Sequence, residues 1–403
     1  MRTRRQKECC AAAVMLLVSV ALTAAMVVRA AGQEGVQLLC YALICLSFSW
    51  AMAAATRAGE ESGGESAALT ASGPAEILVH HRRPQAAGRQ TAPIINAFSI
   101  DLEDYFHTEV AAQAVGFEQW DQLPARIEFT MPRLLDLLDE TGTRATIFVL
   151  GWIAERYPRL VREAATRGHE IACHSYRHRA VFRMDRETFY QDTWLAQRLI
   201  EDATGSQVVG YRAPCFSITQ GSEWAFDVLS ELGFRYDSSV HPVRHSFYGN
   251  AHAAREPHLV GSHGLLEIPV AVWKKAGLHL PIGGGAYLRL LPLGYSLRGL
   301  KALNAAEQRP ATVYMHPWEI DPAQPDLHLG WASTIRQTWG TPRMEDRVRQ
   351  MLQSFHFAPM AEAYGELLSG AQRVNAEKDH GSGGGLLTFS AQGIRSSPAS
   401  SPQ

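Results

Sequence analysis

Two kinds of apolar pattern alternate along the central part of the chain. Short runs of β-branched and apolar residues have the length of buried strands, and stretches with apolar positions at helical spacing separate many of them. The predicted strands cover residues 94–100, 143–150, 170–173, 207–211, 234–236, 265–270 and 311–315. The predicted helices lie around the leucines of residues 134–138 and over residues 157–167, 186–203, 223–232 and 344–355. Strands and helices that take turns for more than 200 residues are typical of βα units, so we expect an α/β fold built on a parallel sheet or barrel.

The N-terminal 60 residues carry two long apolar runs, over residues 11–28 and 36–55, after a basic start. Each run is roughly 20 residues long, which is enough for a helix to cross a bilayer. The basic start favours a hairpin with both ends in the cytoplasm, which predicts attachment to a membrane with the remaining chain on the cytoplasmic side. The alternatives are a cleaved signal peptide, which would export the protein, and a misassigned start, which would leave it cytoplasmic.

The segments that flank the patterned region differ from it in composition. Residues 61–93 hold Gly, Ser, Ala, Glu and Arg without periodicity, which is typical of a linker. Residues 372–403 contain a Gly-rich stretch and a Ser/Pro ending, which predict a disordered tail. The chain therefore divides into apolar segments (1–60), a linker (61–93), one folded domain (94–371) and a tail (372–403).

Composition supports a packed domain without a strongly charged partner. Apolar residues make up 46% and charged residues 19% of the 403 residues, which is enough to form a sizeable core. The formal net charge of -2 gives no overall attraction to nucleic acid, so we expect no nucleic-acid partner. Four of the six cysteines lie in or beside the N-terminal apolar runs and no CxxC pair is present, so nothing argues for a disulfide framework.

Reactive side chains follow four of the predicted strands at their carboxyl ends. They are Asp101, Glu103 and Asp104 after the first strand, His174 and His178 after the third, Arg212 after the fourth and His316 after the last. In parallel βα folds the carboxyl ends of the strands share one edge, where the functional side chains collect. We therefore expect these residues to meet although they are far apart in the sequence.

The two histidines, four residues apart in the sequence HSYRH, predict part of a metal site. A turn can aim both imidazoles at one ion, and one carboxylate completes a two-His, one-carboxylate set with open positions for water and substrate. The acidic cluster can supply that carboxylate and a second one that acts as general base on the attacking water. The alternatives are two unrelated loop histidines and an acidic run that caps a helix.

Three further polar residues complete the predicted site. Arg212, in the sequence GYRAP, can hold a catalytic carboxylate in its charged form. His316 can act as the general acid that protonates a leaving amine. Asp237 can pair with an imidazole or adjust the charge of Arg212.

Taken together, these motifs resemble the polysaccharide deacetylase family, the NodB-homology or carbohydrate esterase family 4 enzymes. The matching segments are FSIDLEDYFH (98–107), HSYRH (174–178), RAP (212–214), GFRYDSS (233–239), EIP (267–269) and HP (316–317). The last two are similar to signatures of the peptidoglycan-deacetylase-like branch that is associated with exopolysaccharide and PEP-CTERM loci. One departure is that the family's adjacent Asp-Asp pair is replaced here by Asp101-Leu102-Glu103-Asp104.

The resemblance implies a distorted (β/α) barrel with fewer than eight strands that binds a divalent metal ion, with zinc as the first expectation. It also implies removal of N-acetyl groups from a polysaccharide, either an exopolysaccharide or a cell-envelope glycan. Asp101 is then the base, and His316 is the acid for the departing sugar amine. The two histidines of the HSYRH sequence would bind the metal together with Glu103 or Asp104, and the sequence leaves both carboxylates open.

Three other functions share parts of this pattern. An O-acetyl esterase would use the same metal chemistry, and its substrate would be chosen by rim loops over residues 242–257 and 275–292. A metal-independent amidohydrolase acting on a small amide would not need the complete histidine pair. An inactive glycan-binding module would tolerate the loss of Asp101.

Overall fold

The computed structural model describes residues 93–243, 249–250, 252–275 and 277–379, together with two strands at residues 387–390 and 393–396. The apolar segments predicted over residues 1–60 and the linker predicted up to residue 92 lie outside these ranges. Within the described part of the chain, no helix combines the length and the apolar character needed to cross a membrane. The described residues belong to one unit that begins at Pro93.

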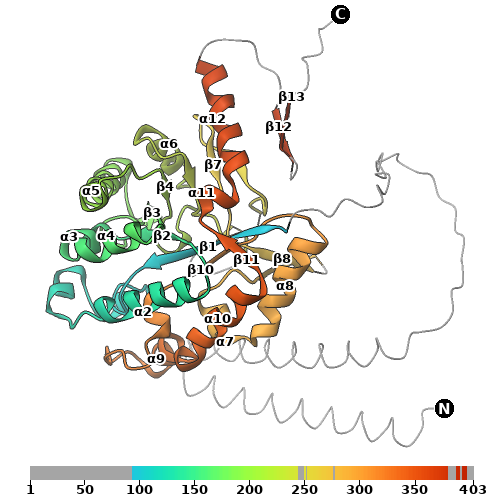
Figure 1. Cartoon of the computed structure of the whole chain (residues 1–403). Coiled ribbons are helices and arrows are strands. Elements are labelled where there is room, and N and C mark those ends of the chain that lie inside the picture. Colours follow the sequence, from blue (N-terminus) through green and yellow to red (C-terminus); the bar gives the residue numbers. More distant parts are fainter. Residues whose placement is uncertain are drawn as a thin grey trace, which may run out of the picture. The chain divides into compact units, whose positions relative to one another are not determined.

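A nine-stranded sheet forms the centre of the described residues (Figure 1). Its strands are β1 (Ile95–Leu102), β2 (Thr146–Val149), β3 (Glu170–Cys173), β4 (Gly210–Tyr211), β5 (Tyr236–Asp237), β6 (His258–Val260), β7 (Leu265–Glu267), β10 (Thr312–Met315) and β11 (His356–Ala358). The order is β10-β1-β2-β3-β4-β5-β7-β6, and β11 pairs with β1. Among the described strands, the seven from β10 to β7 run parallel, whereas β6 is antiparallel to β7. This parallel path agrees with the predicted barrel of fewer than eight strands, and β6 and β11 are additions to it.

The segment that follows β7 joins the two ends of the parallel path. Ala271 N donates to the carbonyl oxygen of Thr312 in β10 (3.0 Å), and Tyr314 N donates to Gly283 O (2.6 Å). Gly284 has a φ of 133°, and a Cβ at this position would lie 1.8 Å from the carbonyl oxygen of Tyr314. Only glycine permits so close an approach of two backbones. The sheet therefore curls into the distorted barrel that was predicted.

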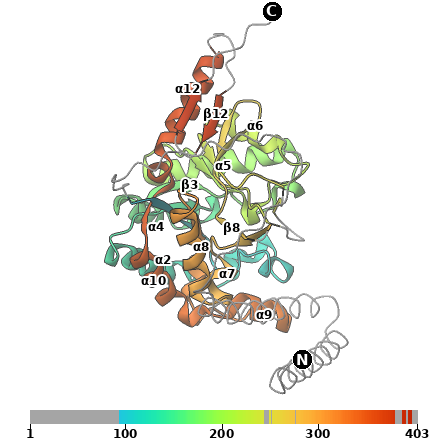
Figure 2. The ribbon, with the colours of Figure 1, turned by 90° about the vertical axis from the view of Figure 1, so that its right-hand side faces the viewer.

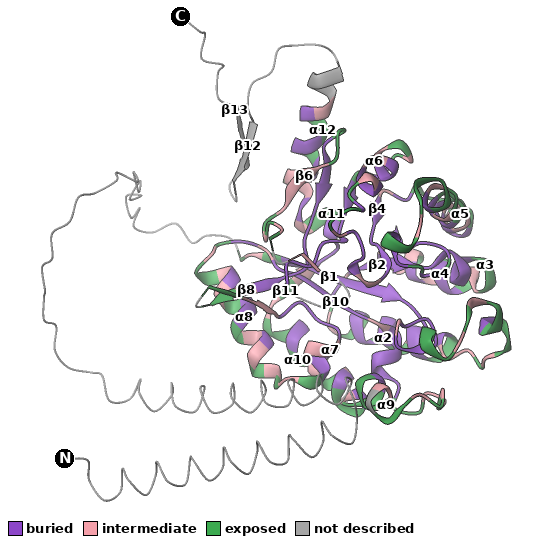
Figure 3. Cartoon of the chain, turned by 180° about the vertical axis from the view of Figure 1, so that it is seen from behind, coloured by how far each residue is buried: buried purple, intermediate pink, exposed green. Residues whose placement is uncertain are grey.

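Helices cover the sheet. They are α2 (Ile127–Glu140), α3 (Gly151–Arg156), α4 (Pro158–Thr166), α5 (Arg186–Thr204), α6 (Trp224–Glu231), α7 (Ala286–Leu290), α8 (Leu293–Ala305), α9 (Trp331–Thr338), α10 (Met344–Ser354), α11 (Met360–Ala363) and α12 (Gly365–Asp379). The helices α3 to α6 lie together on one flank (green in Figure 1), and α7 to α10 group on the lower side in both Figure 1 and Figure 2. Buried residues concentrate on the strands and on the inner faces of these helices (purple in Figure 3).

Local capping sets the ends of α5, the longest of the described helices. The side chain of Asp185 accepts a hydrogen bond from Thr188 N at the first turn (2.8 Å). Gly205 ends the helix in the left-handed conformation, with a φ of 69°. Between these ends, Phe189 is fully buried and fixes the rotation of the helix about its axis. This orientation places Asp192 beside the turn that follows β3.

The structure departs from the predicted pattern where the periodicity is weak. The strands β4 and β5 have two residues each, which is shorter than predicted. An antiparallel hairpin made of β8 (Val272–Lys275) and β9 (Leu278–Pro281) was not predicted, and neither were α8 and α9. Within the predicted rim loop over residues 275–292 the structure places β9 and α7, whereas α8 and α9 lie further along the chain.

The last helix also extends beyond the predicted end of the domain. α12 continues to Asp379, whereas the prediction placed a disordered tail from residue 372 onward. Val374 is buried, and Asn375 Nδ2 donates to the carbonyl oxygen of Gly264 just before β7 (3.1 Å). These contacts hold the helix against the sheet beyond residue 371, and the Gly-rich composition that begins further along the chain concealed them.

Candidate active site

Asp101 and Glu103 lie at the carboxyl end of β1. Side chains alternate between the two faces of a strand, so residues two positions apart share a face. Asp101 and Glu103 are 2% and 3% exposed, so both carboxylates are buried at the end of the barrel. The Asp-Leu-Glu spacing therefore delivers two carboxylates to the same place.

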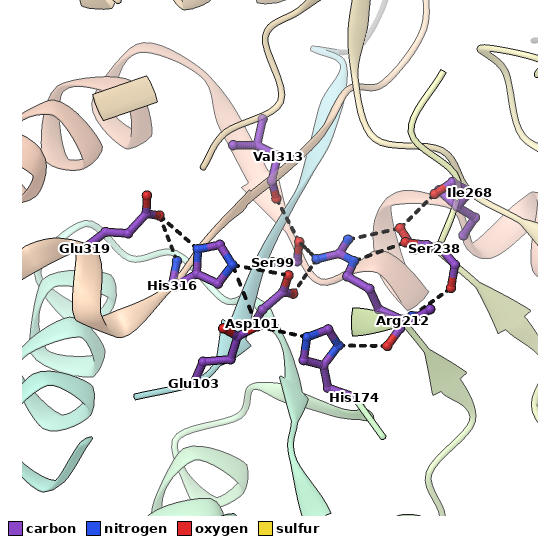
Figure 4. A network of polar contacts seen from close by, with 12 residues as sticks. Ser99, Asp101, Glu103, His174, Arg212, Ser238, Ile268, Val313, His316 and Glu319 are labelled. Atoms are coloured by element: carbon purple, nitrogen blue, oxygen red, sulfur yellow. Dashed lines mark hydrogen bonds and ion pairs between the residues drawn. The ribbon is translucent and has the colours of Figure 1, made fainter. Parts of the chain in front are cut away.

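His174 and His178 bring imidazole nitrogen atoms to the carboxylate of Glu103. Nε2 of His174 lies 3.1 Å from Glu103 Oε1, and Nε2 of His178 lies 2.9 Å from the same oxygen. The other ring nitrogen of His174, Nδ1, lies 2.7 Å from the carbonyl oxygen of Arg212 (Figure 4). Because a carbonyl oxygen can only accept, Nδ1 carries the hydrogen. In a neutral imidazole this leaves a lone pair on Nε2, aimed at the carboxylate.

This arrangement of acceptor atoms fits a cation. Burial alone would raise the pKa of Glu103, but His178, His316 and His174 outweigh it and hold the pKa of Glu103 well below its usual value, so its carboxylate is charged. A charged carboxylate that faces two imidazole nitrogens at this distance needs a positive charge between them, which is either a proton on an imidazole or a metal ion in its place. Imidazole nitrogen and carboxylate oxygen are ligands that zinc prefers, and one such atom from each of Glu103, His174 and His178 lies within 4.8 Å of the others.

A turn with two left-handed residues aims the histidines. Ser175 has a φ of 67° and His178 has a φ of 51°, values that are uncommon for residues other than glycine. Asp192 of α5 holds this turn, because its Oδ2 accepts hydrogen bonds from Ser175 Oγ and Tyr176 N, both at 2.8 Å. Backbone strain of this kind is concentrated at functional sites. The predicted turn is confirmed, and Asp192 is a supporting residue that no local motif marked.

Asp104 points to the following helix instead of the histidines. Its Oδ1 accepts the backbone N–H of Tyr105 (2.8 Å), and its Oδ2 accepts those of Arg126 (2.6 Å) and Ile127 (2.9 Å) at the start of α2. Burial raises the pKa of Asp104 to about 6, and these three donors counter part of that effect. The helix-cap interpretation of the acidic run is therefore correct for Asp104. Of the two carboxylates left open as metal ligands, the geometry brings Glu103 to the histidines and directs Asp104 to the start of α2.

A fully buried arginine holds Asp101. Arg212 Nη1 donates to Asp101 Oδ1 (2.7 Å) and to Ser99 Oγ (2.8 Å), as Figure 4 shows. Its Nη2 donates to Ser238 Oγ (3.0 Å), and its Nε donates to the carbonyl oxygen of the same serine (3.2 Å). The guanidinium carbon also lies 4.1 Å from the centre of the Phe148 ring. Arg212 is placed beside a carboxylate as predicted, and the two serines that orient it were missed.

His316 lies on the other side of Asp101 from Arg212 (Figure 4). Its Nε2 is 3.9 Å from Asp101 Oδ2 and 3.8 Å from Glu103 Oε1, and its Nδ1 is 3.2 Å from Glu319 Oε2. Burial alone would lower the pKa of His316, but the three carboxylates outweigh it and raise the pKa to about 9. His316 can therefore carry a proton close to Asp101, as a general acid must.

Asp237 belongs to a separate buried pair with Glu267. Ser239 Oγ donates to Asp237 Oδ1 (2.5 Å). Burial, followed by the charge of Asp237, raises the pKa of Glu267 well above its usual value, so the pair retains a proton. The hydrogen-bond partners of Asp237 in the described residues are Ser239 and Glu267, and an influence of its charge on Arg212 stays a prediction. The carboxylate beside His316 belongs to Glu319. Glu319 follows His316 by three residues in the sequence HPWE, and the sequence analysis did not use this spacing.

Two family models match consecutive parts of this domain. Residues 117–236 match the polysaccharide deacetylase model, and residues 238–365 match a domain of unknown function, DUF3473. The histidine pair and Arg212 fall within the first match, and His316 falls within the second. Asp101 and Glu103 precede both.

Several curated proteins are similar to part of the chain. The peptidoglycan-N-acetylglucosamine deacetylase of Bacillus cereus is 26% identical over 167 residues, which cover 38% of this chain and 60% of that protein. A chitooligosaccharide deacetylase of Sinorhizobium fredii is 34% identical over 111 residues, 27% of this chain and 49% of that one. The peptidoglycan deacetylase of Helicobacter pylori is 29% identical over 113 residues, 28% of this chain and 38% of that one. The chain thus spans 60% or less of the length of these relatives.

Solved structures of related description also align with the chain. One, described as a candidate polysaccharide deacetylase from Mycobacterium smegmatis, has a TM-score of 0.46 at 22% identity and covers 73% of this chain and 95% of that one. A family 4 carbohydrate esterase from Streptomyces lividans in complex with acetate has a TM-score of 0.35 at 15% identity and covers 66% and 91%. Residues 117–236 thus match the polysaccharide deacetylase family, and the curated relatives that are similar to part of the chain are deacetylases.

Proposed function

We propose that this protein is a metal-dependent hydrolase that removes N-acetyl groups from a polysaccharide. One observation supports this more than any other: three kinds of functional group converge on one point. These are the metal-ligand set of Glu103, His174 and His178, the carboxylate of Asp101 and the imidazole of His316. Each is needed for a different part of amide hydrolysis, and a binding module would need none of the proton-transfer geometry.

A divalent ion, with zinc as the first expectation, would be held by Glu103, His174 and His178. Such an ion polarises the acetyl carbonyl and lowers the pKa of the attacking water. The protein prepares one ligand in advance, because the carbonyl oxygen of Arg212 fixes the hydrogen of His174 on Nδ1. Asp192 prepares the other by holding the turn before His178.

Asp101 and His316 divide the two proton transfers between them. Arg212 occupies Oδ1 of Asp101 and leaves Oδ2 facing the reaction centre. Asp101 accepts a proton from the attacking water as the water oxygen bonds to the acetyl carbon. His316 then gives the proton on Nε2 to the sugar nitrogen as the carbon–nitrogen bond breaks. The products are acetate and a free amine on the glycan.

A glycan that contains N-acetylglucosamine is the substrate class we propose. The relatives from Bacillus cereus and Sinorhizobium fredii are named for N-acetylglucosamine in peptidoglycan and for chitooligosaccharides. An exopolysaccharide or a cell-envelope glycan is the polymer we propose within that class. The predicted attachment of residues 11–55 to a membrane, with a cytoplasmic catalytic domain, is a separate proposal that rests on the sequence pattern.

Acetate release by the full-length protein tests this function. N-acetylglucosamine oligomers and an O-acetylated xylan are assayed with chelator, without chelator and after zinc is restored. His174→Ala is compared with the matched control His356→Ala, whose side chain is exposed on β11. We expect release from the oligomers to fall to background with chelator and in His174→Ala, and zinc to restore it only in the parent and the control.

Three outcomes contradict the proposal in different ways. Release that ignores chelator and His174→Ala would favour a metal-independent amidohydrolase. Acetate from the xylan but not from the oligomers would favour an O-acetyl esterase. No acetate from either glycan, with zinc bound, would favour a glycan-binding module. Thermal unfolding with and without zinc tests metal binding separately from activity, because an ion that binds only the folded state raises the melting temperature.

A further inference from the structure

Glu319 forms a second layer behind His316. Its carboxylate is fully buried. Its Oε2 accepts the backbone N–H of His316 (3.0 Å) and lies 3.2 Å from His316 Nδ1. A carboxylate can only accept from the ring, so Nδ1 donates and Nε2 is left to face Asp101 and Glu103. Glu319 thus fixes both the backbone and the ring of the histidine.

Arg289 of α7 forms a third layer behind Glu319. Its Nε donates to Glu319 Oε1 (2.7 Å), and the side chain is only 2% exposed. The rest of its guanidinium donates to carbonyl oxygens at the end of α9, from Nη1 to Trp339 O (2.8 Å) and from Nη2 to Arg336 O (3.1 Å). The last carbonyl groups of a helix carry partial negative charge, so this end of α9 favours the cation. Arg289 is therefore clamped between α9 and Glu319.

An aromatic ring restricts the remaining motion of His316. The Trp318 ring stacks on the imidazole with an angle of 24° between the planes and 5.3 Å between the centroids. The guanidinium carbon of Arg289 lies 5.0 Å from the centroid of the same tryptophan. Trp318 is buried, so it supports the histidine and is not an exposed platform for sugar rings.

We propose that Glu319 and Arg289 are positioning residues that hold His316 with Nε2 toward the reaction centre. The inference rests on the proposed deacetylase function and assigns a task to the segment of unknown function. The residues His316, Glu319 and Arg289 all lie within residues 238–365, as do the helices α7 and α9. That segment builds the acid side of the site, whereas the first family segment supplies the histidine pair.

The leaving group separates positioning from general structural damage. A sugar amine cannot leave as an anion, so breaking the carbon–nitrogen bond needs the proton from His316. The phenolate of 4-nitrophenyl acetate leaves without a proton, so its hydrolysis uses the attacking side of the site alone. A misplaced His316 therefore slows the amide and spares the aryl ester, whereas damage to Asp101 or to the metal ligands slows both.

The test compares Glu319→Gln and Arg289→Met with the parent on tri-N-acetylchitotriose and on 4-nitrophenyl acetate, using full-length protein loaded with zinc. For Glu319→Gln we expect kcat on the amide to fall by about 100-fold, the lower range for loss of a general acid, with KM changed less than about twofold. The rate on the aryl ester should stay within about threefold of the parent. Arg289→Met should lower the amide kcat by about 10-fold with the same selectivity.

Controls separate the inference from the function on which it rests. Glu170→Gln removes a charge from another carboxylate, one that accepts from Thr146 Oγ and Tyr236 OH, and should leave both rates unchanged. Glu319→Asp keeps the charge and serves if Glu319→Gln does not fold. Equal losses on the two substrates, or no loss on either, with parental zinc content overturn the positioning role. A parent that hydrolyses the aryl ester but no N-acetyl oligomer overturns the proposed function instead.

Discussion

Replacing Arg212 by methionine should destabilise the protein severely. The side chain is fully buried, and its guanidinium lies 2.7 Å from a carboxylate oxygen of Asp101, which is itself only 2% exposed. Removing it leaves the buried carboxylate of Asp101 without its hydrogen-bonded cation, with only the more distant His316 at 3.9 Å, and takes a donor from the hydroxyls of Ser99 and Ser238. Breaking a buried ion pair in this way costs about 3–5 kcal/mol. Coulomb's law gives a similar size, about 4 kcal/mol for unit charges 4 Å apart at an effective dielectric constant of 20.

Urea unfolding of the zinc-loaded protein measures this loss, and a double-mutant cycle assigns it to the pair. We expect Arg212→Met and Asp101→Asn each to lower the free energy of unfolding by about 3 kcal/mol or more, because each removes the hydrogen-bonded partner of a buried charge. The double variant leaves neither charge, so its loss should be smaller than the sum of the single losses by about 2–3 kcal/mol. All three variants should lose deacetylation, since the base is either displaced or absent.

An exposed ion pair provides the matched control. Arg144 lies 3.1 Å from Asp139, but the two side chains are 43% and 41% exposed. Arg144→Met should therefore cost less than about 1 kcal/mol, because solvent screens exposed charges. A loss of that small size for Arg212→Met, or strictly additive losses in the cycle, would refute the idea that Arg212 balances the charge of Asp101.

Two other predictions concern the neighbouring carboxylates. Asp104→Asn should lower the free energy of unfolding by about 1–2 kcal/mol, because the α2 cap is lost, and should leave the zinc content at the parental level. Glu103→Gln should abolish zinc binding. Zinc lost in Asp104→Asn and kept in Glu103→Gln would identify Asp104 as the ligand instead. Because the pKa of Glu267 is raised, the folded state keeps a proton that the unfolded state releases above about pH 4.3. The free energy of unfolding therefore falls as the pH rises from there toward the pKa of the folded state. Glu267→Gln should remove this effect, so it should be more stable than the parent at pH 8 but not at pH 4. If urea unfolding gives the same difference in the free energy of unfolding between variant and parent at both pH values, the expected direction of the pH effect is wrong.

The sequence pattern predicted an α/β fold on a parallel sheet or barrel because its signals are local and repeated. Apolar runs of strand length and helical periodicity mark β1, β2, β3 and β10 and the helices between them, and functional side chains follow the strand ends. The same logic would have decided between Glu103 and Asp104. Strand alternation continued past Leu102 puts Glu103 on the face of Asp101, and Asp104 on the other.

Other features depend on contacts that no local pattern encodes. The pairing of His316 with Glu319, and not with Asp237, follows from the turn after β10, where a carboxylate three residues along can reach both the backbone and the ring. Arg289 reaches Glu319 from a short helix that the sequence pattern did not indicate. The membrane segments and the linker lie outside the described residues, so their attachment and topology stay predictions.

The strand order explains why the two family segments need each other. β1 lies between β10 and β2, and Ile100 pairs with Met315, so Asp101 and His316 follow paired residues on adjacent strands. Asp101, the proposed base, is therefore next to His316, the proposed acid, only after a strand near the start of the domain has paired with one more than 200 residues later. Residues 117–236 on their own contain the histidine pair but neither Asp101, Glu103 nor His316. The proposed reaction site is thus a property of the closed barrel, and the segment of unknown function is part of the same folded domain instead of an appendage to it.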